Sequence, residues 1–180
     1  MRAQLFSNPL SSTALTTALV LAMVLSGCAN PSPGASSSGD PATWLPSRIG
    51  DTEIQYLSGT VEERANPLIF DEQVLVRAGL DPDLAQVTTG AGRNGFTVIG
   101  IRVPGISAER LVQPMVRAGK LEPVDETRTT ISSHPVTILR LPDYTNDTAY
   151  LVPVADTLVV VLSDNRPDAI ELINGLPQTA

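Results

Sequence analysis

Two short stretches of the chain are apolar on both faces of a strand, and they constrain the fold more than any other feature. One is Phe96–Val103, and the other is Leu158–Leu162, in which every residue is apolar. A strand with apolar side chains on both faces fits the middle of a sheet, where neither face meets water. Both stretches are therefore predicted to be central strands.

Alternating apolar stretches predict the remaining strands, and turn signals separate them. Asn94-Gly95 predicts a hairpin turn before Phe96–Val103, and Ala155-Asp156 predicts a second turn before Leu158–Leu162. Pro153 is expected at an edge or a bulge, because proline has no N–H to donate to a neighbouring strand. The other predicted strands are Ile49–Ser58, Leu84–Thr89, Thr127–Ile131, Val136–Leu141 and Thr148–Val154.

Three helices are predicted from capping residues and from apolar residues at helical spacing. Asn66-Pro67 offers an N-cap and a first-turn proline for a helix over Leu68–Ala78. Ser107 can cap a second helix, which Pro114 is expected to kink or shorten. The third helix is predicted over Asp168–Asn174.

The order of these elements predicts the α+β class, with an antiparallel sheet and helices packed on one face. The hairpins that end in Phe96–Val103 and in Thr157–Leu162 each lead through a proline-containing loop into a helix. This likeness favours a duplicated β-β-α unit. In the second unit, Ala169, Leu172 and Ile173 are spaced to form the apolar stripe of the helix.

The first 28 residues have the pattern of a secretory signal. Arg2 precedes an uncharged, apolar stretch over 10–25, and small residues precede Cys28, the only cysteine of the chain. The run Leu25-Ser26-Gly27-Cys28 resembles the lipobox of bacterial lipoproteins. In that family the signal is removed, and the cysteine becomes the first residue and carries a diacylglycerol on its sulfur. The alternative is a retained transmembrane helix, although 10–25 is shorter than the roughly 20 residues of a span.

This resemblance divides the chain into three parts. Residues 1–27 are the predicted signal peptide, 28–43 the lipidated cysteine with a disordered Pro/Ser/Gly linker, and 44–178 a single globular domain. The domain also loosely resembles, over 45–177, an uncharacterised group of bacterial secreted lipoproteins, and this likeness brings no catalytic residues. With Cys28 acylated, the mature chain has no thiol for a disulfide, for catalysis or for a metal site.

The acidic net charge of the chain argues against two classes of binding partner. The chain has a formal net charge of −7, which becomes −8 when Arg2 leaves with the signal. Binding to nucleic acid or adsorption to anionic lipid needs a basic face, so neither is expected of this acidic domain. The acyl chains on Cys28 are therefore expected to hold the protein at the extracytoplasmic face of the membrane.

Two motifs suggest binding or catalysis but lack the context that either needs. The segment Gly90–Gly95 matches G-x-G-x-x-G, yet a strand is expected after it, so a hairpin turn is a better interpretation than a dinucleotide site. Arg93 and Asn94 in this turn are weak binding candidates. The only histidine, His134, lies in a turn without a G-x-S-x-G elbow, and a solvated turn residue is expected rather than a member of a triad.

No metal, cofactor or catalytic residue is assigned. One histidine without a free thiol does not make a zinc cage, and Asp143–Asp147 has turn composition rather than the spacing of a calcium loop. A glycosidase would need two carboxylates at a defined separation in a cleft, which a sequence does not give.

These observations favour a membrane-anchored lipoprotein with a non-enzymatic binding or structural role at the cell envelope. Its partner would be an envelope protein or a small ligand. The alternative is a small envelope hydrolase that uses His134 or a carboxylate pair. A deep pocket holding His134 beside a serine and an acid would favour the hydrolase, and a shallow surface site would favour binding.

Overall fold

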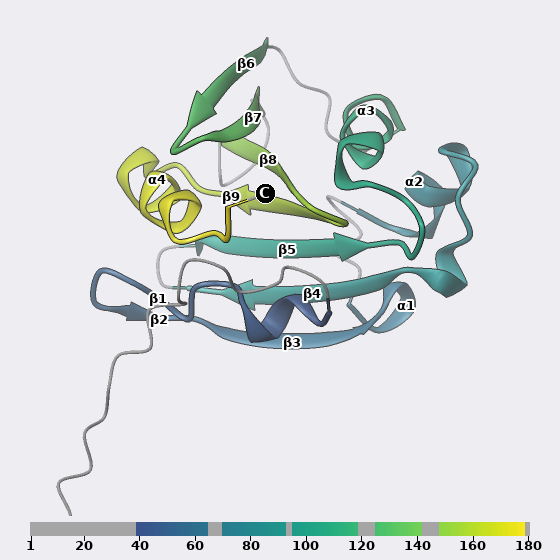
Figure 1. The fold of residues 1–180 in the computed structure, drawn as a ribbon, viewed down its shortest axis with the longest axis horizontal. Coiled ribbons are helices and arrows are strands. Elements are labelled where there is room, and N and C mark those ends of the chain that lie inside the picture. The colour runs from purple at the N-terminus through teal and green to yellow at the C-terminus, as the bar shows by residue number, and fades with distance from the viewer. Residues whose placement is uncertain (1–38, 65–69, 93–94, 119–124, 142–147, 179–180) are drawn as a thin grey trace, which may run out of the picture.

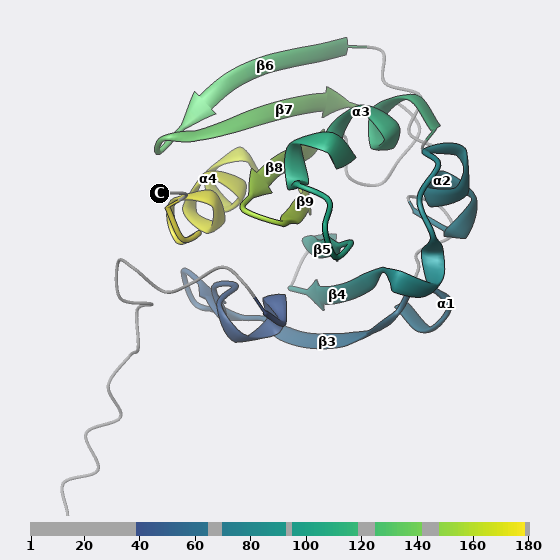
Figure 2. The same ribbon diagram turned by 45° about the vertical axis from the view of Figure 1, so that its right-hand side comes forward.

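The fold is built on an antiparallel sheet of seven strands with helices against both of its faces (Figure 1, Figure 2). The computed structural model describes residues 39–64, 70–92, 95–118, 125–141 and 148–178. From edge to edge, the strands are β3 (Gln55–Thr60), β4 (Gln86–Ala91), β5 (Thr97–Arg102), β9 (Thr157–Leu162), β8 (Thr148–Val154), β7 (His134–Arg140) and β6 (Asp125–Ile131). The described helices are α1 (Val61–Arg64), α2 (Glu72–Arg77), α3 (Ala108–Ala118) and α4 (Arg166–Asn174), with the 3-10 turns η1 (Pro41–Thr43) and η2 (Pro82–Leu84).

The two apolar stretches lie at the centre of this sheet, as predicted. β9 lies between β5 and β8, and all six of its residues are buried. β5 lies between β4 and β9, and its four middle residues are buried. The removal of this apolar surface from water is the main favourable term in holding the sheet together.

Apolar side chains form two cores, one on each face of the sheet. The side chains of β9 alternate between them, with Val160 in the first core and Val161 in the second. Helices α2 and α3 contribute Leu75 and Leu111 to the first core, whereas α4 contributes Leu172 to the second. The predicted α+β class with an antiparallel sheet is confirmed. The helices, however, lie on both faces rather than on one, because central strands that are apolar on both faces need a cover on each.

The predicted duplication is visible in the strands but not in the helices. The hairpins β4–β5 and β8–β9 lie symmetrically about the pairing of β5 with β9, and α3 and α4 follow them in the chain. β5 and β9 are antiparallel, so the two-fold rotation that exchanges them has its axis perpendicular to the sheet. Such a rotation does not exchange the two faces of the sheet, so two helices related by it would lie on the same face. The two helices pack into opposite cores, so no such rotation relates the two units.

Both predicted hairpins are present. β4 pairs with β5, and β8 pairs with β9 across Ala155-Asp156. Ala155 has a φ of +52°, which is the left-handed conformation that tight hairpin turns require. Gly95, before β5, has a φ of +77°, whereas its predicted turn partner Asn94 lies outside the described residues.

The helices differ from their predicted limits. The Asp71 carboxylate caps α2 by accepting a hydrogen bond from the N–H of Val74 at 3.3 Å. The cap predicted at Asn66-Pro67 lies outside the described residues. Pro114 does not shorten α3, which continues for another turn, and α4 ends at Gly175 as predicted.

The folded domain begins earlier than predicted. The Asp40 carboxylate caps η1 and accepts a hydrogen bond from Ser58 Oγ at 2.6 Å. Pro41 is buried at Gly100 of β5, where an added Cβ would lie 3.2 Å from the proline ring. The turn η1 and its cap, Asp40, therefore belong to the folded domain. The linker predicted over 28–43 ends before Asp40 rather than at residue 43.

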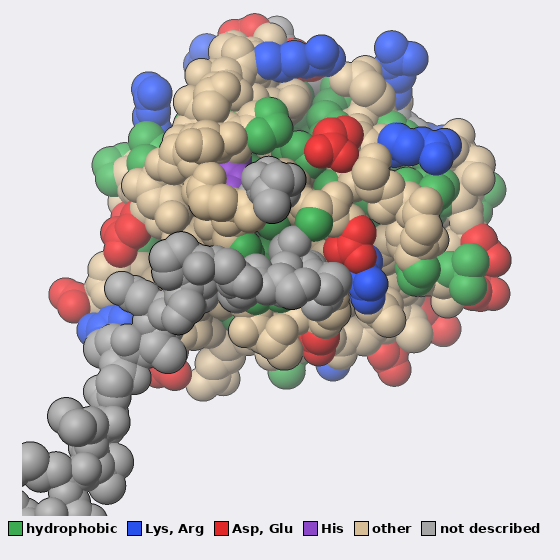
Figure 3. All heavy atoms as spheres, in the orientation of Figure 1, with side chains coloured by type: hydrophobic (Ala, Val, Ile, Leu, Met, Phe, Trp, Pro, Cys, Tyr) green, Lys and Arg blue, Asp and Glu red, His purple; other side chains and the backbone are tan. Residues whose placement is uncertain are grey.

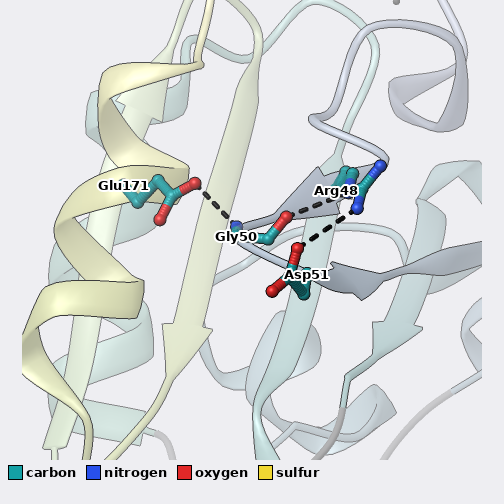
Figure 4. A network of polar contacts seen from close by, with 4 residues as sticks. All are labelled: Arg48, Gly50, Asp51 and Glu171. Carbon is teal, nitrogen blue, oxygen red and sulfur yellow. Dashed lines mark hydrogen bonds and ion pairs between the residues drawn. The ribbon is translucent and has the colours of Figure 1, made fainter.

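The strand predicted over Ile49–Ser58 is interrupted by a small hairpin of β1 (Arg48–Ile49) with β2 (Thr52–Glu53), and β3 follows it. At the turn, Gly50 has a φ of +52° and donates its N–H to Glu171 Oε1 of α4 at 2.7 Å (Figure 4). Arg48 donates to the Gly50 carbonyl at 2.9 Å and to Asp51 at 3.4 Å. The hairpin is thereby held against α4 on the second face.

Candidate functional site

The glycine-rich segment Gly90–Gly95 has a structural role in the sheet. Gly90 lies opposite Tyr56 in the β3–β4 pairing, and a Cβ at this glycine would lie 2.5 Å from the tyrosine ring. The missing side chain leaves room for the ring, an arrangement that stabilises glycine in a sheet. Strand β5 follows the segment, so the helix N-terminus of a dinucleotide site is absent. The weak candidates Arg93 and Asn94 lie outside the described residues.

His134 is buried, which corrects the prediction of a solvated turn residue. It is the first residue of β7 and has no exposed surface. Its Nε2 lies 3.4 Å from the side-chain amide nitrogen of Gln178, in the segment that follows α4. Burial lowers the pKa of His134, and a hydrogen bond with the backbone of Leu176 partly offsets this. The neutral imidazole is therefore the favoured form, because the C-terminal segment excludes water from the ring.

The surroundings of His134 do not form a Ser–His–acid arrangement. Ser132 Oγ donates a hydrogen bond to Asn174 and so is engaged away from the histidine. Within the described part of the chain, His134 Nδ1 has no hydrogen-bond partner, so no acid orients the ring. A triad requires both an oriented imidazole and a nucleophile hydrogen-bonded to it.

The described ranges contain neither a cluster of metal-ligating side chains nor a helix that could span a membrane. No group of three or more His, Cys, Asp or Glu side chains there is placed to hold a metal ion. No helix in those ranges is long and apolar enough to cross a membrane. The segment Asp143–Asp147, the signal predicted over 1–27 and Cys28 all lie outside the described residues.

The sheet divides between β7 and β8. The two strands pair up to Thr137 and Leu151 and no further, although both of them continue. After one more pair, Val136 with Val152, the same register would place Pro135 opposite Pro153, with the backbone of each directed at the other strand. Neither residue has an N–H, so this position lacks both of the ladder hydrogen bonds that would hold the strands together. The predicted edge position of this strand is wrong, because β8 lies between β9 and β7. Pro153 lies instead where the pairing of β8 with β7 has ended.

The division opens a surface cavity, which we call the fork cleft. It has a volume of about 250 Å³. Helix α3 lines it with Glu109 and Val112, and β6 lines it with Arg128. The lining also includes the two prolines of β7 and β8. The cleft therefore combines an acid, a base and apolar side chains from four elements.

The two charged side chains of the fork cleft do not form an ion pair with each other. Arg128 instead donates from Nε and Nη2 to Glu126 Oε1, at 3.1 and 2.9 Å, two residues away on β6. A guanidinium has five N–H donors, so these bonds hold its position while leaving other donors available. Glu109 forms no hydrogen bond or ion pair within the described part of the chain. Glu109 and Arg128 thus both line the cleft without pairing with each other.

A second concavity, of about 630 Å³, is lined by three carboxylates, Asp40, Glu63 and Asp83. Two of these stabilise local structure. Asp40 caps η1, and Glu63 accepts from the N–H of Thr60 at 3.1 Å while donating its own N–H to Thr60 Oγ1 at 3.3 Å. The hydrogen bond from Ser58 lowers the pKa of Asp40, whereas a general acid needs a raised pKa. This concavity therefore does not support a catalytic carboxylate pair.

The rest of the surface is ordinary in composition. Figure 3 shows acidic and basic side chains interspersed over the face in view rather than gathered by sign. Three large apolar side chains are more than half exposed, Leu57, Val76 and Leu84, and they come from β3, α2 and η2. Isolated exposed apolar residues are normal for a soluble domain. The fork cleft is a more specific candidate because four elements converge on it.

Nothing in the sequence alone marks Glu109 or Arg128 as site residues, since an exposed charge on a helix or an edge strand is common. The one available signal is the pair Pro135 and Pro153, each beside or within a predicted strand. Recognising it requires the pairing of β7 with β8 and its register.

No family model matches the chain, and no curated protein or solved structure matches it either. What the site can do must therefore be derived from its own residues.

Proposed function

We propose that this protein is a lipid-anchored, extracytoplasmic binding domain with a non-enzymatic role at the cell envelope. The observation that carries the proposal is the lipobox-like run Leu25–Cys28, which ends in the only cysteine of the chain. The folded domain begins with Asp40, the cap of η1. A flexible tether over 29–39 would have a root-mean-square length of about 18 Å. It would keep the domain close to the membrane surface.

The binding role is supported by the fork cleft. Ligand sites combine apolar walls with a few placed polar groups, and this cleft has both. The hydrolase alternative receives no support from the groups that it would use. His134 is buried beneath the C-terminal segment, and two of the three carboxylates of the larger concavity, Asp40 and Glu63, cap local structure.

The anchor is tested by Cys28→Ser in the native host, with Ser26→Ala as the matched control, because alanine keeps the small residue that the lipobox pattern requires. The parent chain and the control should be labelled by radioactive palmitate and should sediment with membranes. The serine variant should lose the label, because serine has no thiol for the thioether bond to diacylglycerol.

Two results would contradict the anchor. One is palmitate labelling of the serine variant equal to that of the parent. The other is a mature parent protein that has the mass of the complete, unprocessed chain, which would indicate a retained transmembrane helix in place of a removed signal.

A further inference from the structure

We propose that the fork cleft binds a small zwitterion of the size of a free amino acid, with its ammonium group toward Glu109 and its carboxylate toward Arg128. This inference rests on the binding role proposed above and names the class of ligand for that site.

The size of the cleft limits the ligand. Its 250 Å³ corresponds to roughly eight water molecules at about 30 Å³ each. Pockets for drug-sized ligands begin near 300 Å³. A nucleotide or an oligosaccharide is therefore too large to be enclosed, whereas a molecule of about eight non-hydrogen atoms fits.

The lining of the cleft offers hydrogen-bond acceptors. Glu109 on α3 presents a carboxylate that has no partner among the described residues. Pro135 and Pro153 add backbone carbonyls that the alternation of the ladder directs into the opening, without the N–H groups that normally accompany them. An ammonium group has three donors and no acceptor. It can satisfy these carbonyls and the carboxylate together.

The lining also offers donors. Arg128 is held on β6 by Glu126 through Nε and Nη2, and among the described residues nothing bonds to its Nη1, so this nitrogen can donate to a carboxylate. Bonds between a guanidinium and a carboxylate are among the strong hydrogen bonds of proteins. Because Glu109 and Arg128 do not pair with each other, a ligand with both charges can satisfy each of them at once.

Apolar groups complete the lining. Val112 and the rings of the two prolines contribute to it. They suit a short branched aliphatic side chain, so L-valine is the probe with the best match of size and charge.

The test is a titration of the full chain, isotopically labelled and held in detergent micelles, followed by NMR of backbone amides. L-valine is compared with isobutylamine, which lacks the carboxylate, and with isovalerate, which lacks the amine. We expect L-valine to shift the amides of Val112 and Thr137 and to bind at least 10-fold more tightly than either analogue, because hydrogen bonds to charged groups are worth about that much or more. Binding of all three probes with the same affinity would overturn the proposal, as would no response to about 10 mM L-valine, ten times a weak dissociation constant of 1 mM.

Two variants locate the charges. Glu109→Gln and Arg128→Gln should each weaken L-valine binding about 10-fold and should leave the melting temperature unchanged, since both side chains are exposed. Arg110→Gln is the matched control, because Arg110 is the exposed neighbour of Glu109 on α3 but does not line the cleft. A loss of affinity in the control equal to that in Arg128→Gln would show general electrostatic attraction and would overturn the site.

These outcomes are separable from those of the anchor experiment. Failure of L-valine to bind would remove the ligand class and leave palmitate labelling of Cys28 unaffected. Failure of the labelling would remove the membrane location and leave the titration of the cleft unaffected.

Discussion

Replacing Leu172 by alanine should destabilise the domain by about 3–5 kcal/mol. A buried Leu→Ala change typically costs about 2–5 kcal/mol, and the cost is higher where the surroundings do not collapse into the cavity. Leu172 has no exposed surface and packs in the second core. The wall opposite includes β9, which is paired on both sides and so has little freedom to move inward. This places the expected cost in the upper part of the range.

The assay is thermal unfolding of the chain that starts at Ala29, followed by circular dichroism. For a domain of this size, 1 kcal/mol corresponds to roughly 3–4 °C in Tm, so Leu172→Ala should lower Tm by about 9–20 °C. Leu57→Ala is the matched control, because Leu57 is 56% exposed and its loss should change stability by about 0.5 kcal/mol or less. A Tm for Leu172→Ala within the error of this control would refute the packing of α4 on the second face.

Three further changes test other parts of the structure by chemical denaturation. Gly90→Ala should cost about 1–3 kcal/mol by overpacking, because the new Cβ would lie 2.5 Å from the Tyr56 ring, and an unchanged midpoint would contradict that contact. Burial lowers the pKa of His134 below 6.5. The contribution of His134 to the free energy of unfolding is therefore complete above about pH 6.5 and declines as the pH falls through its folded pKa. His134→Gln should flatten the dependence of stability on pH between pH 7 and 5. The pKa of Asp40 is lowered from 3.8, chiefly by the hydrogen bond from Ser58. The contribution of Asp40 to the free energy of unfolding is therefore complete above pH 3.8 and is lost as the pH falls below it. Asp40→Ala should cost about 0.5–2 kcal/mol at pH 7 through loss of the cap, and the difference in stability between the variant and the parent should shrink below pH 3.8.

The two pH predictions are distinguishable from each other. The His134 effect falls between neutral and mildly acidic pH, whereas the Asp40 effect begins only near its ordinary pKa of 3.8. A profile for His134→Gln that keeps the slope of the parent between pH 7 and 5 would mean that another group titrates there.

Most strands were predictable because their signals are local. The Ala155-Asp156 turn lies between two apolar stretches and predicts the β8–β9 hairpin from neighbouring residues alone. Strand β6 was predictable for the same reason, although all but one of its residues are exposed. The break between β1 and β3 was not, because the turn at Gly50 depends on a hydrogen bond to Glu171, which lies far along the chain.

The faces covered by the helices depend on contacts that no local pattern contains. An apolar stripe on α4 indicates that the helix is buried, but not against which side of the sheet. Likewise, the position of His134 at a turn predicts exposure, and only the C-terminal segment with Leu176 and Gln178 buries it. Both errors concern long-range packing.

The fork cleft shows the same limit in its clearest form. Neither proline by itself predicts a break in the pairing of β7 with β8. Pro153 predicts only an edge or a bulge for its strand, and Pro135 only precedes a predicted strand. Their effect arises because the register from Thr137 and Leu151 brings them opposite each other, where two missing N–H groups coincide. A one-residue change of register would no longer place the two prolines opposite each other. The candidate site is therefore a property of strand alignment. Pro135→Val together with Pro153→Val should let the ladder continue and close the cleft, and slow hydrogen exchange of the new amides at positions 135 and 153 would reveal it.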